Sequence, residues 1–148
     1  MEPFTRAFIR ASLAYLALGA SLGVAMLAFP GLYFLRFAHM HINLLGWVSM
    51  MIYGVAYHVL PRFTGNPLYS RSLAWTHFGF VNVGLPGMVL FGGLGGGPYH
   101  PVWGPPLLAA GAVQALGIGL FVFNLWMSIR EHPATTPFPV QPGVGAGV

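Results

Sequence analysis

The sequence contains no cysteine, lysine or aspartate, and only six arginines and two glutamates are charged among its 148 residues. Without cysteine there is no disulfide, thiolate zinc site, iron–sulfur cluster or covalently attached c-type haem. Soluble domains are about one-quarter charged, whereas this chain is 5% charged and 56% hydrophobic. Its net charge of +4 is too small and too scattered to form a phosphate-binding surface. The composition therefore excludes a soluble globular enzyme, a disordered tail and a nucleic-acid-binding domain.

Four apolar stretches without a charged residue divide the chain: residues 11–29, 41–60, 73–91 and 107–129. About 20 apolar residues of helix cross the hydrocarbon core of a bilayer, so each stretch is long enough to span it. A helix also satisfies its own backbone hydrogen bonds in lipid. We therefore predict an all-α, integral-membrane four-helix bundle within residues 1–132. The proline- and glycine-rich segment 133–148 is expected to be a flexible tail.

The arginines indicate the orientation of this bundle. Five of them lie on one side of the apolar stretches: Arg6, Arg10, Arg62, Arg71 and Arg130. Only Arg36 lies on the other side, where segment 92–106 carries no charge and is too glycine-rich to be expected to form a helix. The positive-inside rule predicts that both termini are cytoplasmic. The expected location is the cytoplasmic membrane of a prokaryote.

Two histidines at the outer end of the second stretch, His39 and His41, are the leading candidate ligands. On a regular helix they point about 200° apart, so one metal ion held by both is not expected. His39 shares its side of the helix with Asn43 and with Gly46, which would leave room for a flat macrocycle. Neutral imidazole in an apolar bundle is what haem iron binds. The pair thus indicates haem or copper ligation, or interfacial histidines whose ring nitrogens are hydrogen-bonded.

The other histidines have weaker claims. His77 lies near the cytoplasmic start of the third stretch, too deep to share an iron with the first pair, and a hydrogen bond to a neighbouring helix is expected. His100 lies in the outside loop, where it is an ordinary loop residue, a second axial ligand or a cap over the site. His58 is expected at the cytoplasmic interface, and we assign no role to His132.

Polar and small residues within the stretches are expected to join the helices. Interhelical hydrogen bonds are predicted for three residues: Asn82, Gln114 and Asn124. Close helix–helix contact, within one chain or between copies, is predicted for three others: Gly111, Gly117 and Gly119.

Residues 38–48, AHMHINLLGWV, resemble the H-x-H helix of haem–copper oxidase catalytic subunits. The similarity is greatest to the C-family oxidases and their nitric oxide reductase relatives, in which the motif reads like H-V-H-x-x-x-L-G-W-V. It continues through LPR at 60–62, LYS at 68–70 and LAWTHF at 73–78. In the family these correspond to a proline-ended helix, a short loop containing YS and a helix opening with W-H-F-W. The resemblance covers residues 38–85 by motif and the flanking stretches by pattern alone.

The resemblance implies a role for each histidine of the motif. In the family, the first is the proximal ligand of the high-spin haem and the second is an axial ligand of the low-spin haem, roles that fall here on His39 and His41. The family subunit takes its copper ligands and its other axial histidine from earlier helices. Here the first and fourth stretches contain no His, Asp or Glu. One chain therefore does not complete a binuclear centre.

The sequence as a whole predicts a small membrane protein that binds haem b through His39, His41 or both. Its role would be electron transfer or binding of a small gas such as nitric oxide or oxygen. Any enzymatic activity would be that of an oxidoreductase of this type. The expected partners are the lipid bilayer, a respiratory redox protein and further copies of the chain, one of which would supply a second axial ligand unless His100 does. Two alternatives remain open: a non-catalytic or assembly subunit without a cofactor, and a copper-binding protein using His39, Met40, His41 and His100.

Overall fold

A computed structural model describes residues 1–95 and 100–130 of the chain. Within these residues every regular element is a helix and no strand occurs. Four helical segments are long and apolar enough to cross a membrane: Pro3–Ala28, Pro30–Thr64, Arg71–Gly93 and Gly104–Ile129. The predicted all-α architecture with four membrane-length helices is therefore confirmed. The predicted tail and His132 lie outside the described residues.

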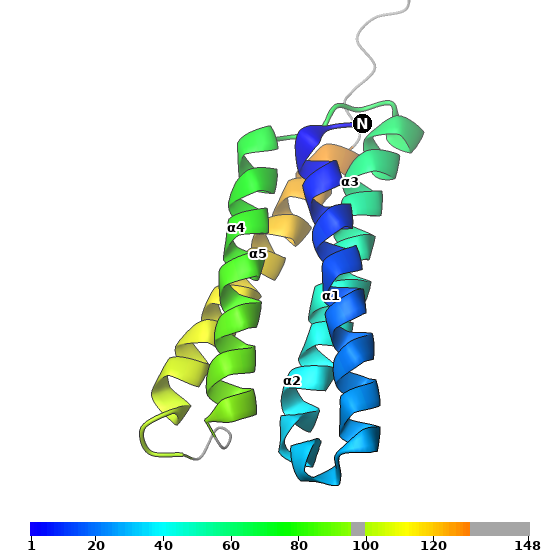
Figure 1. Ribbon diagram of the computed structural model, residues 1–148. Coiled ribbons are helices and arrows are strands. Elements are labelled where there is room, and N and C mark those ends of the chain that lie inside the picture. The colour runs from blue at the N-terminus through cyan, green and yellow to red at the C-terminus, as the bar shows by residue number, and fades with distance from the viewer. Residues whose placement is uncertain (96–99, 131–148) are drawn as a thin grey trace, which may run out of the picture.

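Two of the four segments are single α-helices and two are composite (Figure 1). The single helices are the first segment, α1 (Pro3–Ala28), and the fourth, α5 (Gly104–Ile129). The second joins a 3-10 turn η1 (Pro30–Leu35), α2 (Arg36–His41), a π-helix η2 (Ile42–Ser49) and α3 (Met50–Thr64). The third joins α4 (Arg71–Met88) to a second π-helical segment, η3 (Val89–Leu94).

The helices extend beyond the apolar stretches from which they were predicted. The first begins at Pro3 instead of residue 11, so Arg6 and Arg10 lie on the helix and not before it. Proline at the first helical position costs no hydrogen bond, and long basic side chains can extend toward water from a helix end. The second segment begins at Pro30, so both histidines of the H-x-H motif lie inside a continuous helical segment and not at its end.

The glycine-rich segment after residue 91 was expected to be non-helical, and this expectation was wrong in part. Gly92 and Gly93 belong to η3, which continues the third membrane-length helix. An ideal Cβ on Gly93 would lie 2.8 Å from the Cβ of Ala38, and one on Gly92 would overlap the Phe37 ring. These glycines therefore permit close approach of α2, a role that composition alone does not distinguish from loop flexibility.

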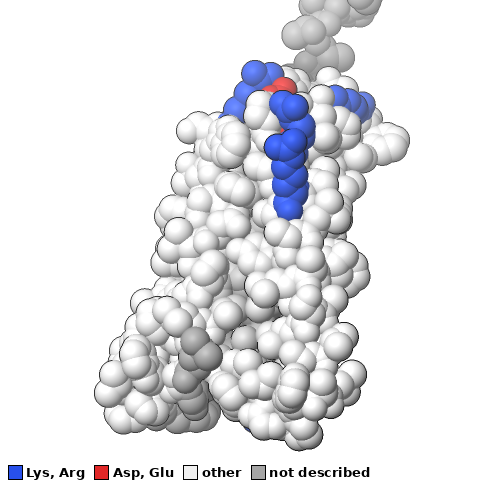
Figure 2. Space-filling model, viewed as in Figure 1, with Lys and Arg blue, Asp and Glu red and all other residues white. Residues whose placement is uncertain are grey.

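Basic side chains gather at the end of the bundle that carries the N-terminus (Figure 2). This end contains the start of α1, the end of α3, the start of α4 and the end of α5. Arg71 forms an exposed ion pair there with Glu2, with Nη2 and Oε1 3.0 Å apart. Arg36 begins α2 near the opposite end, where its guanidinium lies 5.3 Å from the centre of the Tyr33 ring. The charge asymmetry inferred from the sequence is thus reproduced by the helix arrangement.

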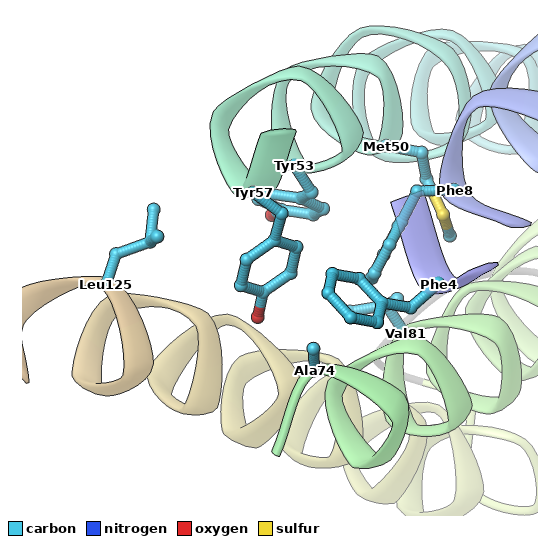
Figure 3. Packing of buried hydrophobic residues seen from close by; sticks show 8 residues of the cluster. All are labelled: Phe4, Phe8, Met50, Tyr53, Tyr57, Ala74, Val81 and Leu125. Carbon is cyan, nitrogen blue, oxygen red and sulfur yellow. The ribbon is translucent and has the colours of Figure 1, made fainter. Parts of the chain in front are cut away.

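The buried hydrophobic residues drawn in Figure 3 form a cluster toward the basic end, since they include Phe4 and Phe8 near the start of α1. Its members come from all four membrane-length helices: Phe4, Phe8, Met50, Tyr53, Tyr57, Ala74, Val81 and Leu125. In Figure 1 the pair α1 and α3 meets the pair α4 and α5 at this end. At the other end η3 packs against α2.

Close contact between α4 and α5 depends on glycine. An ideal Cβ on Gly84 would lie 2.7 Å from the backbone N of Gln114, and one on Gly117 would lie 2.7 Å from Cγ1 of Val81. The predicted close contact is therefore found at Gly117. Nothing lies within 4 Å of an ideal Cβ at Gly111 or Gly119.

The three polar residues expected to join helices differ in their partners. Asn82 lies on α4, and its Oδ1 accepts a hydrogen bond from the Tyr15 hydroxyl of α1 at 3.3 Å, as predicted. Asn124 bonds a connecting segment instead of a helix, since its side chain accepts from the N–H of Ser70 at 3.0 Å and donates to the carbonyl of Ser70 at 2.8 Å. Gln114 is buried and neither polar atom of its side chain has a partner, contrary to the prediction.

Candidate functional site

A groove of about 730 Å³ lies between α2 and the first turns of α5, away from the basic end. Ligand sites in proteins have volumes of about 300–1,000 Å³ and mostly apolar walls. The walls here come from α2, the end of α4 and the chain around the start of α5, and they include Phe37, His41, Met88, His100, Leu107 and Gly111. The groove therefore brings His41 of the H-x-H motif together with His100, which precedes α5.

The backbone on both sides of this groove departs from regular α-helix. The π-helix η2 begins at Ile42, directly after His41, and η3 packs against α2. π-helical turns are rare, and many occur at functional sites. Because η2 is a π-helix, successive side chains after His41 are not related by the 100° rotation of a regular α-helix, on which the comparison of helix faces from the sequence was based.

His41 has one ring nitrogen fixed and the other available. Its Nδ1 lies 2.8 Å from the carbonyl oxygen of Phe37, and its ring stacks on the Phe37 ring with centroids 4.0 Å apart. A carbonyl only accepts hydrogen bonds, so Nδ1 carries the proton and Nε2 retains its lone pair. Histidines that bind metals are held in this way, with the second nitrogen donating to a carbonyl, carboxylate or water.

His39 has a different setting, and its Nδ1 faces both an acceptor and a donor, because the amide nitrogen of Asn43 also lies 3.3 Å from it. Its Nδ1 lies 3.1 Å from the carbonyl oxygen of Gly19 on α1, and an ideal Cβ on Gly23 would lie 2.9 Å from its Cε1. Asn43 donates to the carbonyl of His39 at 2.8 Å, and its side chain fills the space beside Gly19. His39 does not line the groove, and its ring packs against α1.

Gly46 also packs against α1. The Tyr15 ring lies where the side chain of residue 46 would be, since an ideal Cβ on Gly46 would lie 2.6 Å from Cγ of Tyr15. The room that the sequence suggested for a macrocycle beside Gly46 is therefore filled by a side chain of the same protein.

His100 lies at the mouth of the groove, just before α5, and its side chain is exposed. Its Nδ1 accepts hydrogen bonds from the backbone N–H groups of Val102 and Trp103, both at 3.3 Å. A nitrogen that accepts cannot carry the proton, so the neutral ring is protonated at Nε2. His100 and His41 therefore have opposite tautomers.

His77 lies far from this groove, inside the core at the basic end. It is completely buried, with its Nδ1 3.1 Å from the Tyr57 hydroxyl and its ring 4.6 Å from that of Tyr53. The predicted hydrogen bond to a neighbouring helix is present. The fold does not bring this residue together with His41.

The groove walls supplied by the third and fourth helices could not be recognised from the sequence. Met88 is one of seven methionines in the chain and Leu107 begins a long apolar run, so neither residue stands out in the sequence. The contact of Phe37 with His41 was the one that the sequence could indicate, because residues four apart are neighbours on one face of a helix.

Among the residues that the structure describes, no three His, Cys, Asp or Glu side chains converge as a metal-binding group. Comparison with known proteins gave no matching family model and no matching curated protein.

Proposed function

We propose that this protein is a small integral-membrane protein that binds haem b in the groove between α2 and α5. His41 is the iron ligand in this proposal. The observation that carries it is the combination of a free Nε2 on an imidazole fixed by the Phe37 carbonyl and an apolar groove of suitable size beside that ring. His39 packs against α1 and does not line the groove, so it is assigned to helix packing and not to ligation.

The donor set favours haem over a copper ion held by the protein alone. Haem brings four ring nitrogens of its own to the iron, so one or two protein ligands suffice. A copper ion needs several side chains that converge on one point. One correctly oriented imidazole in an apolar groove matches the first requirement better than the second.

The proposal includes a membrane orientation. We assign the basic end to the cytoplasmic side, following the positive-inside rule, which puts both termini there and the groove in the outer half of the bilayer. The bound group would then serve in electron transfer or in binding a small gas. A respiratory redox partner or a second copy of the chain would approach it from that side.

Haem content tests the proposal directly. The full chain is expressed with an adequate haem supply, purified in detergent and measured by Soret absorbance and by the pyridine haemochrome assay. We expect about one haem b per chain, loss of haem in His41→Ala and retention in His39→Ala. A haem-free wild-type protein would refute the function, and full retention in His41→Ala would refute the ligand.

A second pair of variants tests the groove without altering any histidine. Gly111 lines the groove and Gly119 does not, yet both lie on α5 with nothing within 4 Å of an ideal Cβ. Gly111→Leu should fill the groove and lower haem occupancy severalfold, whereas Gly119→Leu should leave it unchanged. Equal occupancy in the two variants would show that the haem binds elsewhere.

A further inference from the structure

The opposite tautomers of the two groove histidines assign them different chemical tasks. Only an unprotonated ring nitrogen can bind iron, and at His41 this is Nε2. At His100 the unprotonated nitrogen is Nδ1, which already accepts from two backbone N–H groups. The ring atom that His100 has free carries a hydrogen and is a donor.

Conversion of His100 into a ligand would have a structural cost. Moving its proton to Nδ1 would free Nε2 but would set the Nδ1 hydrogen against the N–H groups of Val102 and Trp103. Both hydrogen bonds would then be lost in the turn that leads into α5, which begins at Gly104. The geometry thus disfavours a second axial histidine from this loop.

We infer that His100 is a hydrogen-bond donor over the groove and not an iron ligand, so that one coordination position stays open. This inference rests on the proposed function. The ligand class that fits such a site is a small molecule or anion whose outer atom accepts a hydrogen bond. A hydrogen bond to a negatively charged acceptor is stronger than one to a neutral acceptor. The His100 donor should therefore favour anionic ligands over weak acceptors such as carbon monoxide.

Ligand affinities of the haem-loaded full chain test this inference, with fluoride as the accepting probe and carbon monoxide as the indifferent one. In His100→Ala we expect unchanged haem content, an unchanged high-spin spectrum and fluoride binding weakened by about tenfold to a hundredfold, the range for a hydrogen bond to a charged group. Carbon monoxide affinity should change far less. His100→Gln, whose amide also donates, should recover much of the fluoride affinity, and His58→Ala at the other end is the control.

The possible failures are distinguishable. A low-spin wild-type spectrum that becomes high-spin in His100→Ala would make His100 a ligand and overturn this inference while leaving haem binding intact. Unchanged fluoride affinity in His100→Ala would also overturn it. Nitrogen-15 NMR of the haem-free, histidine-labelled chain gives an independent result, because a proton on Nδ1 of His100 would contradict the tautomer. A wild-type chain without haem would overturn both the function and the inference.

Discussion

Replacement of Gly84 by alanine should force α4 and α5 apart. An ideal Cβ at this position would lie 2.7 Å from the backbone N and 2.8 Å from the Cα of Gln114, where ordinary van der Waals contact begins at about 3.4 Å. Since these are backbone atoms of a facing helix, no rotamer change relieves the overlap. Overpacking of this kind costs about 1–3 kcal/mol. The gain of about 1 kcal/mol in helix propensity offsets part of this cost, so we expect Gly84→Ala to lower the free energy of unfolding by up to about 2 kcal/mol.

The matched control is Gly79→Ala, on the same helix. Nothing lies within 4 Å of an ideal Cβ at Gly79, so the added methyl group meets no protein atom. Alanine also favours helix over glycine by about 1 kcal/mol, and this variant should be as stable as the wild type or slightly more stable. Unfolding in mixed micelles with increasing SDS, followed by circular dichroism, measures both. Equal stability of the two variants would refute the close approach of α4 and α5 at this point.

Three further predictions concern polar contacts at the basic end, all measured by the same unfolding assay. Asn124→Ala should cost about 1–3 kcal/mol, because the N–H and carbonyl of Ser70 both lose a partner, and limited proteolysis should detect faster cleavage between residues 65 and 70. Tyr57→Phe should cost a similar amount by removing the hydroxyl beside His77, whereas addition of His77→Leu should restore part of the loss. Arg71→Ala should change stability by less than about 1 kcal/mol, because its ion pair is exposed, and a larger loss would show that this pair is not an ordinary surface contact.

The number and type of the helices could be predicted because charge and hydropathy report directly on membrane spans. The helix ends could not, since an apolar run marks the part of a helix that lies in lipid and not its full length. Arg6 and Arg10 illustrate this, because they precede the apolar stretch in the sequence and yet lie on α1. Gly93 illustrates a second limit, because a glycine that allows close packing looks the same in sequence as one in a loop.

Only part of the candidate site could be predicted, because its walls come from helices that are distant in the sequence. The H-x-H motif was visible, but the sequence could not assign His41 to a groove and His39 to a contact with α1. That distinction depends on Gly19 and Phe37, whose carbonyls fix the two rings, and on walls from helices distant in sequence. The tautomer of His100 likewise depends on two backbone N–H groups that only the folded loop presents.

The position of the core has a consequence for how the groove is reached. The aromatic core joins the two helix pairs at the basic end, while the groove lies near the opposite end. Opening of the bundle at that end separates η3 from α2 but leaves the aromatic core at the basic end packed, so its free energy is smaller than that of global unfolding. If the proposed function holds, haem would enter the groove laterally from the bilayer through such an opening, without disruption of the core at the basic end.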